Sequence, residues 1–137
     1  MIIDSRLEFS DAQAVTATAA STNIVDLTQD RDIGPGSPMW VICQLDVAAD
    51  AGNSDETYSV GLETDDNASF SSAAVISTFT FTRGDAVGTR KVIGMPYGNE
   101  RYVRLNYTVG GTSPSMTVSA WLTDQEPESW VSFPDAI

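Results

Sequence analysis

The stretch that decides the fold is Met39-Trp40-Val41-Ile42-Cys43-Gln44-Leu45-Asp46-Val47-Ala48. Its residues alternate with a period of two, which is the period of a β-strand. The first side is wholly apolar and consists of Met39, Val41, Cys43, Leu45 and Val47. The second side is mixed, because it carries polar Gln44 and Asp46 as well as Trp40, Ile42 and Ala48. We therefore predict a strand that packs its first side into a hydrophobic core.

The same alternation recurs before and after this stretch in the sequence. Gly-, Asn-, Asp- and Pro-rich clusters separate the segments, and such clusters are typical of turns. Ser10–Ala14 could form one helical turn at most, and no other helix is expected. The spacing predicts an all-β fold, an antiparallel β-sandwich or jelly roll. The further strands are predicted at Thr57–Asp65, Ala74–Arg83 (with Val75, Phe79 and Phe81 on one face), Lys91–Gly94, Tyr102–Val109 and Ser115–Leu122, with one or two more between Val15 and Asp26.

The 137 residues predict a single domain with two extended ends. We expect an N-terminal arm over residues 1–13, a sandwich core over residues 14–123 and a C-terminal arm over residues 124–137. The C-terminal arm contains Pro127 and Pro134, which make it a poor internal strand. Its apolar residues Trp130, Phe133 and Ile137 must pack either on their own sandwich or on a neighbouring subunit.

The charge balance excludes two classes of partner. Seven Lys and Arg residues stand against 19 Asp and Glu residues, which gives a net charge of −12. Nucleic acids and anionic membranes are bound through cationic surfaces, so neither is an expected partner. No apolar run approaches the length of a membrane helix, and the first residues do not form a signal peptide. We therefore expect a protein that is synthesised and stays soluble in a cytoplasm.

Residues for catalysis are scarce in this sequence. There is no histidine, the usual general base and zinc ligand, and the one cysteine, Cys43, is expected to be a buried hydrophobe. The acidic segments 50–56 and 65–67 could ligate calcium, but residues 50–55 lack the ligand order of an EF-hand loop, and we interpret both segments as solvated loops. We predict no enzyme activity, no cofactor and no metal. A glycan-cleaving enzyme would need two convergent carboxylates, one of them with a raised pKa.

Three aromatic residues lie on the less apolar faces of their predicted strands. They are Trp40, Tyr102 and Trp121. Three interpretations are open: an oligomer or partner interface, a second layer of core, or a platform for stacking sugars. The last interpretation corresponds to our alternative function, a carbohydrate-binding module for adsorption to a host surface.

Several separated stretches carry a family resemblance that extends over nearly the whole chain. The sequence resembles the small capsid cement proteins of tailed bacteriophages, the family typified by the cement protein of a Bordetella phage. No catalytic motif is involved, and the family implies no catalytic residue. The similar stretches are Met1–Gln13, Asp30–Gly34, Asn99–Tyr107, Val118–Thr123 and Pro134–Ile137.

This resemblance implies a jelly roll on the outer surface of an icosahedral head. It implies binding where major capsid proteins meet, and stabilisation of the shell. The expected partners are the major capsid protein and the chain itself, with a homodimer favoured and a homotrimer open. The expected location is the outer capsid surface of the virion, after synthesis in the bacterial host. A net charge of −12 suits this role, because it disfavours binding to the packaged DNA.

The candidate capsid or oligomer contacts share one of three properties. They are apolar residues of the two arms, arginines able to bind carboxylates of neighbours through two hydrogen bonds, or the outward aromatic residues. Weak contacts of this kind reinforce one another when several are made at once. The candidates are Met1, Ile2, Ile3, Arg6, Leu7, Phe9, Arg31, Trp40, Arg101, Tyr102, Arg104, Trp121, Trp130, Phe133 and Ile137.

Overall fold

The computed structural model describes residues 3–32 and 38–125. These ranges contain nine strands and no helix, so they hold no helix that could cross a membrane. The all-β prediction is confirmed. The strands are β1 (Glu8–Val15), β2 (Ala19–Ala20), β3 (Val25–Asp26), β4 (Trp40–Val47), β5 (Thr57–Asp65), β6 (Ala74–Phe81), β7 (Arg90–Gly94), β8 (Tyr102–Gly110) and β9 (Met116–Thr123).

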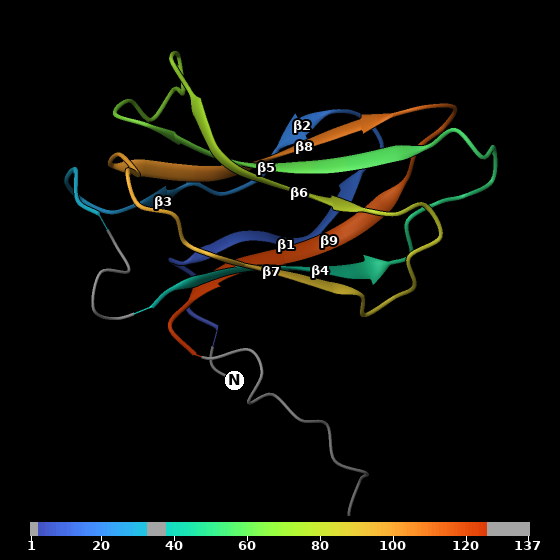
Figure 1. The fold of residues 1–137 in the computed structure, drawn as a ribbon, viewed down its shortest axis with the longest axis horizontal. Coiled ribbons are helices and arrows are strands. Elements are labelled where there is room, and N and C mark those ends of the chain that lie inside the picture. Colours follow the sequence, from blue (N-terminus) through green and yellow to red (C-terminus); the bar gives the residue numbers. More distant parts are fainter. Residues whose placement is uncertain (1–2, 33–37, 126–137) are drawn as a thin grey trace, which may run out of the picture.

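The strands form two antiparallel sheets that stack as a sandwich (Figure 1). The first sheet has the order β1-β9-β4-β7, and the second has the order β2-β8-β5-β6, with β3 also paired to β8. The chain crosses between the sheets at each connection except β2–β3 and the β5–β6 hairpin. If β2 and β3 are taken as one interrupted strand, this is the eight-stranded order of a jelly roll.

The hydrophobic core lies between the two sheets. The alternation predicted from sequence places Val41, Cys43 and Leu45 of β4 there, each fully buried. Strands β5, β8 and β9 contribute in the same way, because each has one apolar face. Their fully buried core residues include Val60, Leu62, Val103, Leu105, Tyr107 and Val118.

The sandwich begins earlier in the chain than the predicted residue 14. Residues 8–13 belong to β1, which pairs with β9, so the proposed arm can include at most the residues before Glu8. Irregularities between Glu8 and Ser10 and between Ser10 and Gln13 interrupt the pairing. The second one contains Ala12, whose φ is 45°. Such bulges break the two-residue alternation, which explains why this stretch did not look like a strand.

Two further bulges reverse predicted side-chain directions. The pairing of β4 with β9 shifts between Leu45 and Val47, and Val47 is exposed instead of buried. The pairing of β5 with β6 shifts between Leu62 and Glu63, and Val75 is likewise exposed while Ile76 packs against the core. One extra residue in a strand moves the following side chains to the other face.

The sandwich has two open sides, where the edges of the two sheets face each other. We call the first the β1 side, because β1 there faces β2 and β3. Gln13 of β1 connects its edges by donating from Nε2 to the Ala20 carbonyl at 2.9 Å. We call the second the β6 side, where β6 faces β7 and the Lys91 ammonium lies 5.8 Å from the centre of the Phe81 ring.

Candidate interaction surface

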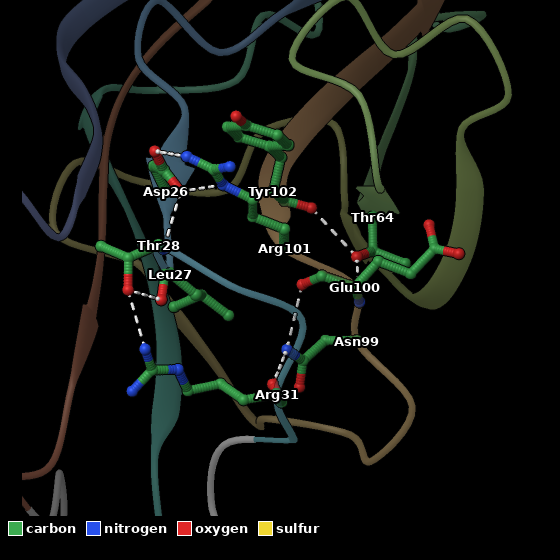
Figure 2. Close-up of polar contacts among 9 residues, drawn as sticks. All are labelled: Asp26, Leu27, Thr28, Arg31, Thr64, Asn99, Glu100, Arg101 and Tyr102. Carbon is green, nitrogen blue, oxygen red and sulfur yellow. Dashed lines mark hydrogen bonds and ion pairs between the residues drawn. The ribbon is translucent and has the colours of Figure 1, made fainter.

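Three of the predicted contact residues meet at one end of the second sheet, where β3 joins the start of β8. Asp26 of β3 pairs with Tyr102 of β8, and this register places the Asp26 carboxylate beside Arg101. The chain after β3 continues along the same edge, since the Leu27 amide donates to the Arg101 carbonyl at 3.0 Å. Figure 2 shows the resulting group, the Arg101 cluster, which consists of Asp26, Thr28, Arg31, Thr64, Asn99, Glu100, Arg101 and Tyr102.

Arg101 is held on two sides. Its Nε and Nη2 atoms donate to the two carboxylate oxygens of Asp26 at 2.9 and 3.0 Å, and its guanidinium carbon lies 4.8 Å from the centre of the Tyr102 ring (Figure 2). The hydrogen bonds from Arg101, assisted by the Thr28 amide, hold the pKa of Asp26 below its usual value. One edge of Arg101 is therefore occupied within the chain. A neighbour's carboxylate could reach only the remaining guanidinium N–H groups.

Arg31 joins the cluster through both its side chain and its backbone. Its Nη2 donates to Thr28 Oγ1 at 2.7 Å, and its carbonyl accepts from Asn99 Nδ2 at 2.7 Å (Figure 2). Asn99 is almost fully buried, so it fixes the segment around Arg31 against the turn before β8. Thr64 of β5 anchors the same turn, because its hydroxyl accepts from the Glu100 amide and donates to the Tyr102 carbonyl.

Arg104 is the next outward-facing residue of β8 after Tyr102. Its side chain also contacts other residues of the chain. Its Nε donates to Glu63 Oε2 at 2.7 Å, and its guanidinium carbon lies 4.1 Å from the centre of the Phe70 ring. Phe70 belongs to the β5–β6 loop and is 93% buried. The loop therefore folds over the outer face of the sheet and covers Arg104 with an aromatic ring. Stacking of this kind uses the planar face that distinguishes Arg from Lys.

The carboxylate of Asp65 organises the same β5–β6 loop. The residue is fully buried and accepts hydrogen bonds from the backbone amides of Asn67 at 2.9 Å and Ser72 at 2.8 Å. Burial opposes its ionisation, but these hydrogen bonds outweigh burial and lower its pKa. Interpreting residues 65–67 as a solvated acidic loop was therefore wrong for Asp65, because the backbone donors of its own loop replace the water around it.

Arg6 and Asp26 line the same shallow groove. The groove has a volume of about 570 Å³ and runs along the β1 side. It connects Arg6 to the Arg101 cluster, since Asp26 and Thr28 belong to both. The structure thus brings four predicted residues, Arg6, Arg31, Arg101 and Tyr102, to one region. The groove is lined by Ser5, Arg6, Glu8, Thr22, Asn23, Ile24, Asp26 and Thr28.

The aromatic residues do not form one platform. Tyr102 lies on the second sheet, whereas Trp40 and Trp121 lie on the outer face of the first. Trp121 pairs with Ile42, and both are buried although neither belongs to the cluster between the sheets. Trp121 is therefore part of a second layer of core, and its prediction as a contact residue needs correction. Trp40 is half-buried and stays a candidate.

The predicted residues of the two ends divide into three groups. Phe9 is fully buried in the core, so it is wrong as a contact residue. Leu7 is partly buried and packs against the same core, whereas Ile3 is 43% exposed. The remaining candidates lie outside the described residues and stay predictions: Met1, Ile2, Trp130, Phe133 and Ile137.

The pKa shifts of four carboxylates run opposite to the shift that a glycosidase acid needs. Hydrogen bonds lower the pKa of Asp26, Asp55, Glu56 and Asp65, so each of these carboxylates favours its charged form. A glycosidase acid requires the opposite shift. Burial raises the pKa of the Cys43 thiol, which makes it a core residue rather than a nucleophile. Residues 3–32 and 38–125 contain no cluster of His, Cys, Asp or Glu that could hold a metal ion.

These features define the class of protein as a jelly-roll β-sandwich with an arginine-rich surface at one end. The family model Bbp16, named after a Bordetella phage protein, matches residues 9–122. This match covers most of the chain and nearly the whole sandwich, so the chain belongs to the Bbp16 family. It is accordingly a phage protein, as the resemblance in its sequence implied. No curated protein matches the chain.

Sequence reasoning missed the partners of the arginines. Asp26, Glu63 and Phe70 were not candidates, although they hold Arg101 and Arg104 in place. A partial signal was present, because opposite charges occur in strands that a jelly roll makes neighbours. Only the register shows that Glu63 lies opposite Arg104 and Asp26 opposite Tyr102.

Proposed function

We propose that this protein is a structural component of the phage virion. In this role it binds the outer surface of the icosahedral head at junctions between major capsid proteins and stabilises the shell. The observation that carries the proposal is the match of a phage family to residues 9–122, the part of the chain that forms the sandwich. The Arg101 cluster supports it, because a rigidly held arginine beside an aromatic ring is typical of the centres of protein interfaces.

The alternative function, a carbohydrate-binding module, has less support. Sugar platforms need aromatic faces that are exposed and close together. Tyr102 is covered on one side by Arg101 and lies on the opposite sheet from Trp40, and Trp121 is buried. We therefore retain the capsid-binding role as the proposal. Within it, a homodimer stays favoured over a homotrimer, and sedimentation equilibrium of the purified chain distinguishes the two.

The test is co-sedimentation with expanded heads assembled without this protein. We expect binding at a fixed stoichiometry at physiological salt. Removal of residues 1–5 or 130–137 should weaken binding if the arms contribute, and both deletions leave Phe9 in its core position. A protein that stays in the supernatant at concentrations well above micromolar contradicts the proposed function for that capsid.

Tyr102→Ala tests the Arg101 cluster in the same assay. This variant removes the half-buried ring from a position where the described residues leave it partly accessible. Thr108→Ala is the matched control, since Thr108 lies further along the outer face of β8 and outside the cluster. We expect at least a severalfold loss of head binding for Tyr102→Ala alone.

A further inference from the structure

The β6 side carries a strand whose outer edge is unusually open. β6 has the sequence Ala-Val-Ile-Ser-Thr-Phe-Thr-Phe, with no charge, proline or glycine over eight residues. It pairs with β5 and lies at the end of its sheet in the described part of the chain. Edge strands usually carry a charge, a proline or a bulge that prevents pairing with another chain. Along the middle and end of β6, from Ser77 to Phe81, the pairing with β5 is regular and none of these devices is present.

The segment that contains this edge differs in charge from the rest of the sequence. The segment Ala74–Gly94 contains three of the seven cationic residues and one of the 19 acidic residues, a net charge of +2 in a chain of −12. Its acidic residue, Asp85, is used within the turn, since its carboxylate accepts from the Thr82 amide. The ion pairs of residues 3–32 and 38–125 involve Arg101 and Arg104. Arg83 lines a groove together with Glu56 and helps to lower the pKa of Asp55, so part of its charge is balanced within the chain.

Two exposed apolar side chains belong to the same segment. Val75 is 59% exposed on β6, and Val87 is 66% exposed in the β6–β7 loop. An open backbone edge, apolar side chains and nearby cations are the features that capture an extended peptide by strand addition. Backbone hydrogen bonds then provide affinity, and the flanking side chains select the peptide.

We infer that β6 is a docking edge for an extended, acidic polypeptide segment of a partner protein, which adds a strand to the β2-β8-β5-β6 sheet. Carboxylates of that segment would lie near Lys91, whose ammonium lies 5.8 Å from the centre of the Phe81 ring at the end of β6. This inference rests on the proposed function, under which the segment belongs to the capsid protein.

A second copy of this chain fits the edge less well. Two copies related by a two-fold axis would bring the Lys91 side chains of both copies toward the same edge. Each copy also carries the full charge of −12. An acidic partner segment meets neither difficulty at this edge, because it complements the local charge.

The test compares three single substitutions in the co-sedimentation assay with expanded heads that lack the protein. Thr78 is exposed on β6, and Thr108 is exposed on β8, an internal strand of the same sheet. We expect Thr78→Asp to bind about tenfold more weakly than the wild type, because it repels an acidic segment. Thr78→Lys should bind as well as the wild type or better, and the matched control Thr108→Asp should bind as the wild type does.

Hydrogen exchange provides a direct second measurement. The amides of Ala74–Phe81 should exchange more slowly in the head-bound protein than in the free protein, and circular dichroism should show that all three variants are folded. If the wild type binds but Thr78→Asp behaves like Thr108→Asp and β6 gains no protection, the inference is wrong and the proposed function stands. If Thr78→Asp and Thr78→Lys both weaken binding and both dissociate a dimer, a second copy occupies the edge. If the wild type does not bind, the proposed function fails, and the inference fails with it.

Discussion

The two open sides of the sandwich have the same architecture but are closed in different ways. On the β1 side, buried polar contacts join the edges of the two sheets: the Asn23 amide donates to the Phe9 carbonyl at 2.9 Å, and the hydroxyls of Ser10 and Tyr107 share a hydrogen bond of 2.7 Å. On the β6 side, the Lys91 ammonium of β7 lies 5.8 Å from the centre of the Phe81 ring of β6. The comparison shows that hydrogen bonds can join the sheet edges on one side of a jelly roll while a cation–π contact lies between the edges on the other.

The largest expected loss of stability comes from a substitution in the hydrophobic core next to the β1 side. Phe9→Ala removes a fully buried ring and should reduce the free energy of unfolding by about 3–5 kcal/mol. Urea denaturation followed by tryptophan fluorescence measures this loss. The control is Thr80→Ala on β6, where the side chain is exposed and a change within about 0.5 kcal/mol is expected. Equal losses for both variants would contradict the contrast between the two sides.

A smaller effect is expected from the polar contacts of the β1 side. The Gln13 side chain accepts from the Thr22 amide and from Ser10 Oγ, and it donates to the Ala20 carbonyl. Gln13→Ala removes the side-chain partner of the Thr22 amide and the Ala20 carbonyl and should cost about 1–3 kcal/mol of unfolding free energy.

The matched control for Gln13 is Gln44→Ala on β4, which removes a glutamine that accepts from the exposed Arg90 side chain. A change within about 0.5 kcal/mol is expected there. Hydrogen exchange of the Thr22 amide should accelerate in Gln13→Ala and not in Gln44→Ala. An unchanged Thr22 rate in both variants would show that water replaces the glutamine without loss.

The loop that leads into β6 should respond to acid. The pKa of Asp65 is lower in the folded protein than its ordinary value of 3.8, so its ionised form stabilises the fold. This contribution is fully present above about pH 3.8 and is lost as the pH falls through the lower, folded-state value. Asp65→Asn should unfold at a lower urea concentration at neutral pH, and its stability should decline less between pH 4 and pH 2.

Exposed Asp11 on β1 provides the control for the acid response. Asp11→Asn should leave the urea midpoint at neutral pH close to that of the wild type. A decline in acid that is identical for Asp65→Asn and the wild type would show that other carboxylates account for it.

The smallest effect on stability is expected on the β6 edge itself. Val75→Thr replaces a side chain that is 59% exposed and keeps the β-branched shape that strands favour. The free energy of unfolding should change by less than about 0.5 kcal/mol, as measured by urea denaturation. A loss above about 1 kcal/mol would indicate that this edge is covered within the chain, and it would weaken the case for a docking strand.

Much of the fold could be predicted because alternation is a local property. β5 was predicted with the same bounds as observed, and β4, β6, β7, β8 and β9 were predicted within two residues at each end. β1 was missed because its bulges break the alternation, and Val47 and Val75 were assigned to the wrong face for the same reason. A bulge is visible only when the partner strand and its register are known.

The candidate site was predictable in its residue types but not in its partners. Arg101 and Arg104 were candidates because arginine can bind carboxylates of neighbours, and Tyr102 was a candidate because it is an aromatic residue at an outward position. Sequence could not show that Asp26 binds Arg101 or that Glu63 binds Arg104, because 75 and 41 residues separate the members of each pair. It also could not show that Phe9 and Trp121 are buried, since burial depends on what covers a side chain.

The sequence by itself determined the all-β class, most of the strands, the negative charge and the family resemblance, since each follows from residue types and their local order. The tertiary structure decided which carboxylates are buried and ionised, which arginines are already engaged, and which sheet edge stays open. These properties depend on strand order and register. Both are set by contacts between residues far apart in the chain, which local patterns do not specify.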